Sequence, residues 1–193
     1  MAVRPNQSET MEAPAVTPAA EPCDNWAWAA GLESLLASQE VALQREFWLF
    51  KAHGGLLCLS PVPDPAGLAA YIPGEYVLDD GRKVRLEAQF TPGAPSNTDE
   101  LIMSLRRGHS FLLVWRGHPY LVYGAVFDEY IARTGARLFE IRELKLINLL
   151  PAKEEDRKVA FVKGRDDPGE IQGVLTVNAT FVQPPNWLHP GTE

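Results

Sequence analysis

The sequence predicts an α+β fold, because helical patterns fill its first part and short strand-like segments fill its second part. Apolar residues recur at helical spacing within residues 26–52, whereas the segments after residue 110 are short and rich in Val, Ile, Leu and Phe. A chain of 193 residues, of which 46% are hydrophobic and 22% charged, can form one domain with a substantial core. We therefore expect helices packed on a largely antiparallel sheet.

The domain is expected to span residues 23–182. Residues 1–22 consist mainly of Ala, Pro, Thr, Glu and Ser, and such a composition buries too little surface to offset the entropy lost on ordering. We predict a flexible lead-in there, and we find no signal-peptide pattern in it. Residues 183–193 are Pro-rich and are predicted to form an extended tail.

Three stretches have helical periodicity: residues 26–39, 42–52 and 97–107. Asp24 or Asn25 is a suitable N-cap for the first helix, and Gly54 is a natural stop for the second. Thr98 is a plausible cap for the third. The side chains expected to face the core are Trp28, Leu32, Leu35 and Leu36 in the first helix, and Leu101, Ile102 and Leu105 in the third.

Short strands are expected elsewhere in the chain. Residues 71–78 and 83–90 read as two strands, and Asp80-Gly81 between them is typical of a hairpin turn. Five further strands are expected at residues 111–115, 119–127, 138–147, 158–162 and 171–177.

Composition and charge exclude several classes of protein. The net charge is -7, from 25 acidic and 18 basic side chains, so no basic stripe is available for nucleic acid. No run of roughly 18 apolar residues could cross a membrane. Cys23 and Cys58 come without a CxxC or paired-His pattern, so we expect neither a metal site nor a cofactor. The compartment stays open, with the cytoplasm slightly favoured.

The most unusual local sequence is Cys-Asp-Asn-Trp-Ala-Trp-Ala-Ala at residues 23–30, where the first helix starts. Trp26 and Trp28 could simply be core anchors. The segment also resembles the nucleophile motif of papain-like cysteine peptidases, in the compact bacterial branch in which Trp-Cys-Trp-Ala-Ala opens the central helix. Ala27 stands at the position of that family's cysteine. A helix N-terminus favours the thiolate, which is the reactive form of such a cysteine.

The resemblance implies a histidine base at the start of a strand after the helical part. His118 fits, because it precedes an apolar strand that ends at Gly124. A surface histidine at a strand start is the alternative interpretation. His109, in the turn before the previous strand, is a weaker candidate for the base.

The third member of the implied triad orients the imidazole through its other ring nitrogen. A hairpin centred on Arg133 would place Asn148 opposite His118. That register puts six side chains on one face, and the family uses Asn or Asp in this role. Asn148 could instead merely end a strand, and Asp128 is a weaker alternative at the far end of the hairpin. The six side chains form the pairs His118–Asn148, Tyr120–Leu146 and Val122–Leu144.

The expected oxyanion donor departs from the family, which supplies a glutamine several residues before the nucleophile. Glu21 stands six residues before Ala27, and its carboxylate would repel a negative charge. Asn25 or the backbone N–H of residue 27 could donate instead, with Trp26 and Trp28 beside the substrate.

The resemblance also implies that Cys23 pairs with Cys58, because papain-like enzymes often tether the segment before the nucleophile to a later loop. Two buried free thiols are an alternative, and so is a catalytic role for Cys23 itself.

The implied protein has a papain-like fold, with the central helix packed on the C-terminal antiparallel sheet. Its implied activity is hydrolysis of peptide bonds in a peptide or protein substrate through a Cys-His-Asn triad, lost here because residue 27 is alanine. An introduced Cys-to-Ala substitution explains Ala27, and we favour it because the rest of the expected site is present. A natural pseudoenzyme or peptide-binding module is the alternative, and an amidase or transglutaminase-like acyl transferase is the second one. The sequence does not specify the oligomeric state.

Overall fold

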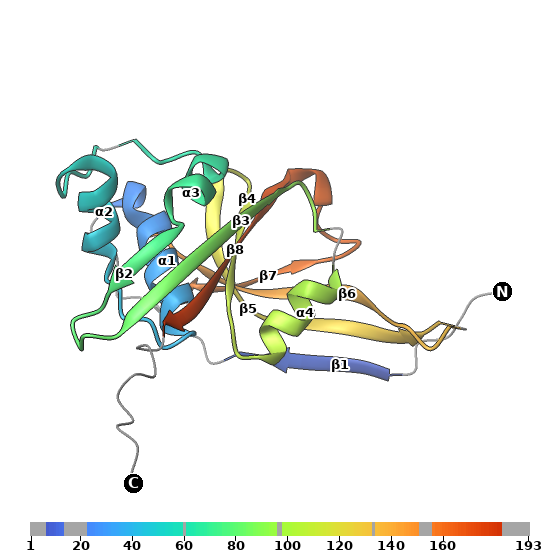
Figure 1. Cartoon of the computed structure of the whole chain (residues 1–193). Helices are drawn as coiled ribbons and strands as arrows, with labels where there is room; N and C mark the ends of the chain where they lie inside the picture. The colour runs from blue at the N-terminus through green and yellow to red at the C-terminus, as the bar shows by residue number, and fades with distance from the viewer. Residues whose placement is uncertain are drawn as a thin grey trace, which may run out of the picture.

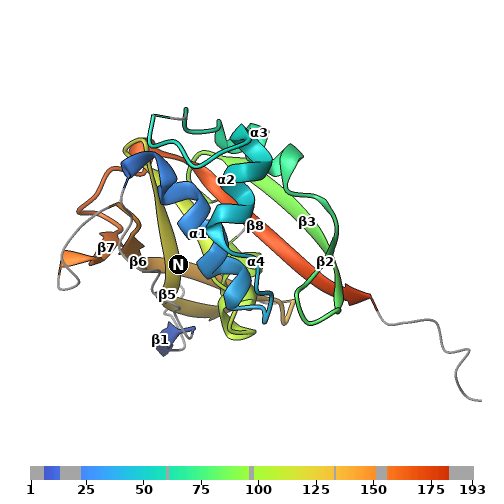
Figure 2. The ribbon, with the colours of Figure 1, turned by 90° about the vertical axis from the view of Figure 1, so that its left-hand side faces the viewer.

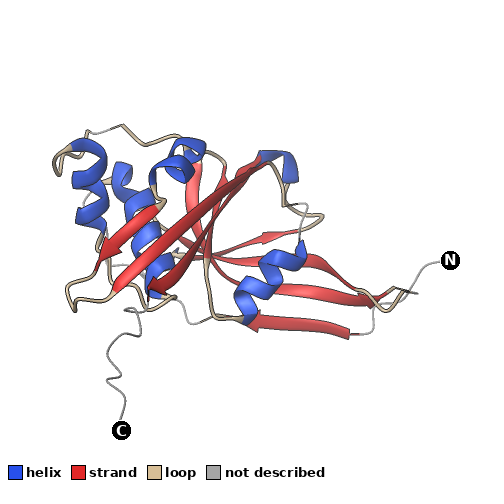
Figure 3. Ribbon diagram, in the orientation of Figure 1, coloured by secondary structure: helices blue, strands red, loops and turns tan. Residues whose placement is uncertain are grey.

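The computed structural model describes residues 7–13, 23–59, 61–95, 98–132, 134–150 and 156–182. In this part of the chain, helices lie on both sides of a curved sheet (Figures 1 and 3). This arrangement confirms the predicted α+β class. The α-helices of the described residues are α1 (Ala27–Ala37), α2 (Arg45–His53), α3 (Pro65–Tyr71) and α4 (Thr98–Arg106).

The sheet follows the strand order β2-β3-β8-β4-β5-β6-β7, and β1 pairs with a further stretch of β5. Every pairing between these strands is antiparallel, as predicted. The strands are β1 (Gln7–Glu12), β2 (Gly74–Val77), β3 (Lys83–Pro92), β4 (Phe111–Trp115), β5 (His118–Ile131), β6 (Arg137–Asn148), β7 (Lys158–Val162) and β8 (Ile171–Val182).

Each face of the sheet has its own core. On one face α1 packs against strand residues that include Leu112, Leu121 and Ile147. On the other face α4 packs against residues that include Leu113 and Val122. Figure 2 looks onto the first face, where α1 and α2 lie in front of the strands. Neighbouring residues of β4 and β5 therefore belong to different cores, as expected from the alternation of side chains along a strand.

The N-terminal lead-in prediction is wrong in part, because residues 7–12 form β1. Its backbone pairs with residues 124–129 of β5, at a point where β4 no longer covers that edge. Gly124 makes this possible, since a Cβ there would lie 2.6 Å from the carbonyl oxygen of Met11. Met11 and Ala13 then pack on the α4 side. Backbone pairing of this kind needs little hydrophobic sequence, which is why composition alone indicated flexibility. The predicted tail, residues 183–193, lies outside the described residues.

The predicted N-cap of the first helix is also wrong. A short 3-10 turn, η1 (Asp24–Trp26), precedes α1, so Trp26 occupies the N-cap position without a side-chain capping bond. The side chains of Trp28, Leu32, Leu35 and Leu36 are buried as predicted. The helix α3 was not predicted, although Asp64 caps it by accepting a hydrogen bond from the N–H of Gly67 and Pro65 is its first residue.

Candidate functional site

The start of α1 is buried against the sheet. Ala27 and Trp28 are each only 2% exposed, and both belong to the core between α1 and the strands. Gly31, one turn later, permits a close approach, since a Cβ there would lie 2.7 Å from Leu149 Cδ1 and 2.9 Å from Leu112 Cδ2. The ring of Trp28 meets His53 of α2 edge-on, with centroids 6.2 Å apart. The position of the expected nucleophile is therefore fixed by packing on several sides.

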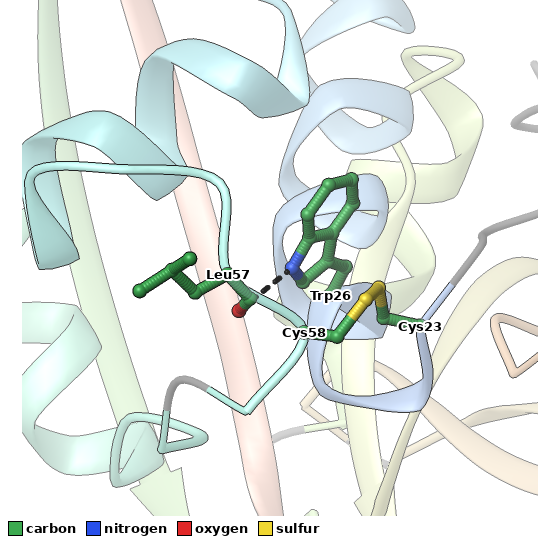
Figure 4. The surroundings of a disulfide bond; sticks show 4 residues. All are labelled: Cys23, Trp26, Leu57 and Cys58. Atoms are coloured by element: carbon green, nitrogen blue, oxygen red, sulfur yellow. Dashed lines mark hydrogen bonds between the residues drawn. A yellow bond between two sulfur atoms is a disulfide. The ribbon is translucent and has the colours of Figure 1, made fainter.

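Two links join the segment before α1 to the loop after α2 (Figure 4). Cys23 and Cys58 form a disulfide, with Cα atoms 5.3 Å apart. Trp26 Nε1 donates a hydrogen bond of 3.4 Å to the carbonyl oxygen of Leu57. The pairing implied by the resemblance is therefore found, whereas the alternatives of free thiols and of a catalytic Cys23 do not describe this structure.

His118 is the first residue of β5, so it starts a strand as predicted. It follows the turn Arg116-Gly117, whose positive φ angles of 52° and 77° close the hairpin between β4 and β5. Pro119, the next residue, lines a cleft together with Trp28. The start of β5 therefore comes close to the start of α1.

His118 lies on the opposite face of that sheet from Ala27. Its cross-strand partner is Trp115, which belongs with Tyr120 to the core on the α4 side. Directly paired residues share a face, and Pro119 and Leu121 occupy the other one. His118 is exposed, whereas Ala27 is buried in the core on the α1 side. The alternation of β5 thus separates the expected base from the expected nucleophile.

The predicted pairing of His118 with Asn148 is wrong, because Asn148 lies opposite Tyr120. The strands of this hairpin pair about a centre at position 134, one residue later than predicted, and this moves the pairing register by two residues. Two bulges, at Val122/Gly124 and Val126/Phe127, add one residue to each strand and cancel. Asn148 is on the same face as His118, as predicted. Its Oδ1 accepts a hydrogen bond from the N–H of Leu150.

The weaker candidates, His109 and Asp128, lie toward other parts of the sheet. The N–H of Ser110 donates to Ser38 Oγ, so His109 lies near the C-terminal end of α1, about 15 Å along the helix from Ala27. Burial lowers the pKa of His109, and the nearby Arg107 lowers it further. Asp128 pairs with Glu140 toward the other end of the hairpin, and hydrogen bonds from Ser8 and then Arg142 hold its pKa below the ordinary value.

The structure does not test the predicted oxyanion donors. Glu21 lies outside the described residues. Asn25 is half-buried within the 3-10 turn before α1. The expectation that the family glutamine is missing stays a prediction.

A cleft of about 340 Å³ opens beside Trp28. Its walls come from α1, from the loop and helix at residues 62–68, and from strands β3, β4, β5 and β8. Most of these side chains are apolar, and Asp64 and Gln172 are the polar ones. The lining residues are Trp28, Val62, Pro63, Asp64, Pro65, Leu68, Phe90, Leu112, Val114, Gly117, Pro119, Gln172 and Leu175. Sequence reasoning placed the groove in the region of residues 59–96 but singled out only Trp28 among the lining residues, although the Asp64-Pro65 helix start was a readable signal for part of the wall.

Neither a metal-binding cluster nor a membrane-spanning helix is found in the described residues. Among them no three His, Cys, Asp or Glu side chains gather in a way that could hold a metal ion. Within the same residues, no helix is long and apolar enough to cross a membrane.

Comparison of the chain with protein-family models, with curated proteins and with solved structures finds no match.

Proposed function

We propose that this chain is a non-catalytic binding module with a papain-like arrangement, which holds a peptide or protein segment in the cleft beside Trp28. The cleft carries the proposal, because an apolar concavity of about 340 Å³ with few polar groups suits the apolar side chains of a partner segment. The papain-like arrangement is supported by the Trp-Ala-Trp start of a helix packed on an antiparallel sheet, and by the disulfide just before it.

Two observations support the proposal that the chain does not catalyse peptide hydrolysis: the residue type at position 27 and the position of His118. Alanine offers no nucleophile at position 27. His118, on the other face of the sheet, is poorly placed to accept a proton from a thiol at that position, since a base must lie within hydrogen-bond reach. This placement favours the natural pseudoenzyme over the introduced substitution. The inactivated peptidase is the competing proposal, supported by the position of His118 at the start of β5, where the next residue, Pro119, lines the cleft with Trp28.

Restoring the cysteine separates the two proposals. We expect Ala27→Cys to react slowly with iodoacetamide near neutral pH, because residue 27 is 2% exposed and burial both shields a thiol and disfavours its thiolate. The matched control is Ala27→Cys combined with His118→Ala, which we expect to react at the same rate. Fast labelling near pH 6 that requires His118 would instead establish the thiol–imidazole pair of a peptidase, and the non-catalytic proposal would be wrong.

Binding is tested with a phage-displayed library of random 12-residue peptides as the probe. We expect enrichment of sequences with an apolar or aromatic side chain, and at least tenfold weaker binding of those peptides to Val62→Asp. Val62 lines the cleft and is 53% exposed, so a charge there should leave the fold intact. Val77→Asp is the control, because Val77 is 66% exposed and does not line the cleft. Equal loss in both variants, or no enrichment, contradicts the cleft as the binding site.

A further inference from the structure

The loop between α2 and α3 leaves its apolar side chains exposed to solvent. Leu57 is 69% exposed and Leu59 is 94% exposed. Residues 54–63 contain no charged side chain. A loop without buried apolar anchors opens at low free-energy cost unless other links hold it.

The links seen for this loop are the two that join it to the start of α1. One is the Cys23–Cys58 disulfide, and the other is the long hydrogen bond from Trp26 to Leu57. The hydrogen bond is a weak restraint because its length is 3.4 Å and its atoms are exposed. Among the described residues, the covalent bond is therefore the main restraint on the part of the loop before α3, whereas α3 itself is held by its buried Leu68.

The same loop continues directly into the cleft wall. Val62 and Pro63 line the cleft, and so does Asp64, which caps α3. Only three residues lie between Cys58 and Val62. A link at residue 58 therefore restricts the wall, whereas the opposite wall, on β4 and β8, is held by the sheet.

We propose that the Cys23–Cys58 disulfide is a redox switch for the cleft, with the wall at residues 61–64 fixed when the bond is formed and loose when it is reduced. This proposal rests on the cleft being the binding site of the proposed function. In this proposal, a dithiol that reduces the disulfide regulates binding at the cleft.

The exchange reaction is balanced with a dithiol reductant. A thiolate of the dithiol attacks the sulfur of Cys58, whose residue is exposed, while Cys23 is only 5% exposed. Cys23 leaves as a thiolate and takes up a proton. The second thiol of the reductant then displaces Cys58, so the reductant is oxidised to a disulfide and the protein gains two thiols.

Hydrogen–deuterium exchange of the full chain tests the switch without any ligand. We expect the amides of Gly67 and Leu68, which hydrogen-bond to Asp64 of the cleft wall, to exchange at least tenfold faster in dithiothreitol than in the oxidised protein, with α1 and β5 unchanged. Cys58→Ser should exchange quickly in both conditions, because it cannot form the bond. Leu59→Ser keeps both cysteines and changes only an exposed side chain of the same loop, so it should respond to dithiothreitol as the unmodified chain does.

Two outcomes overturn the switch. Equal exchange of Gly67 and Leu68 in both states means that the wall is held without the bond. An equal rise along α1 means that the disulfide supports the helix rather than the wall. Either result can occur while library peptides still bind the cleft, and a loose wall can be seen even where no peptide binds. Failure of the switch and failure of the proposed function are therefore distinguishable.

Discussion

The two faces of the sheet are built differently, and the expected catalytic residues are divided between them. The α1 face is closed by a helix that packs tightly at Gly31, and it contains Ala27. The other face is covered by α4, and His118 and Asn148 belong to it. The linear motif therefore predicted that His118 starts a strand, but not the face of the sheet on which it lies. Side-chain alternation along β5 determines the face.

The largest expected effect comes from shortening side chains on the two faces of β5. Leu121 and Val122 are adjacent, fully buried, and belong to different cores. We expect Leu121→Ala to reduce the free energy of unfolding by about 2–5 kcal/mol, through lost burial and a residual cavity. Val122→Ala removes fewer atoms and should cost about 1–3 kcal/mol. Urea unfolding measures both values.

The local consequences of these two substitutions test the division into faces. Native-state hydrogen exchange should become faster in α1 for Leu121→Ala and in α4 for Val122→Ala, because each helix loses its own packing partner. Faster exchange of the same helix in both variants would mean that the sheet does not separate two cores.

The fold was more predictable from the sequence than the site. Trp28, Leu32, Leu35 and Leu36 repeat at helical spacing, and this local pattern predicts a buried face without knowledge of the rest of the chain. The strands β4 and β7 were predicted with correct ends for a similar reason. By contrast, β1 depends on an edge of β5 that exists only in the folded chain.

The site was harder to predict because it depends on register. Tyr120, Val122, Leu144 and Leu146 share one face, as predicted, because faces depend only on whether the register is odd or even. The pairing of His118 with Asn148 depended on the centre of one turn, and a difference of one residue there moved Asn148 opposite Tyr120. Turn centres and bulges are weakly encoded, so motif residues on different elements are the least certain part of such predictions.

A smaller effect is expected at the contact that closes the α1 face. Gly31→Ala gains helix propensity of about 1 kcal/mol, but its Cβ would lie within 3 Å of both Leu149 and Leu112. Crowding of this kind costs about 1–3 kcal/mol, so we expect a net loss of roughly 1 kcal/mol in urea unfolding. The control is Gly67→Ala in α3, where the nearest atom is Asp64 Cβ at 3.9 Å. It should be neutral or slightly stabilising, and a stabilising Gly31→Ala would show that α1 is not closely packed.

The smallest expected effect is the pH dependence of β1, which side-chain hydrogen bonds as well as backbone pairing attach to β5 and β6. A hydrogen bond from Lys145 lowers the pKa of Glu12, and hydrogen bonds from Ser8 and then Arg142 lower that of Asp128. A depressed pKa in the folded state means that this attachment is complete above the ordinary carboxyl values of about 4 and is lost as pH falls below them.

Amide exchange of residues 8–12, corrected for the intrinsic pH dependence, should therefore become relatively faster between about pH 4 and pH 2, before exchange in α1 does. Glu12→Gln removes one of the two carboxylates and should show a weaker pH dependence at β1, with the same behaviour in α1. A β1 that stays protected at pH 2 would mean that backbone pairing and the close approach of Met11 to Gly124 hold the strand without help from charge.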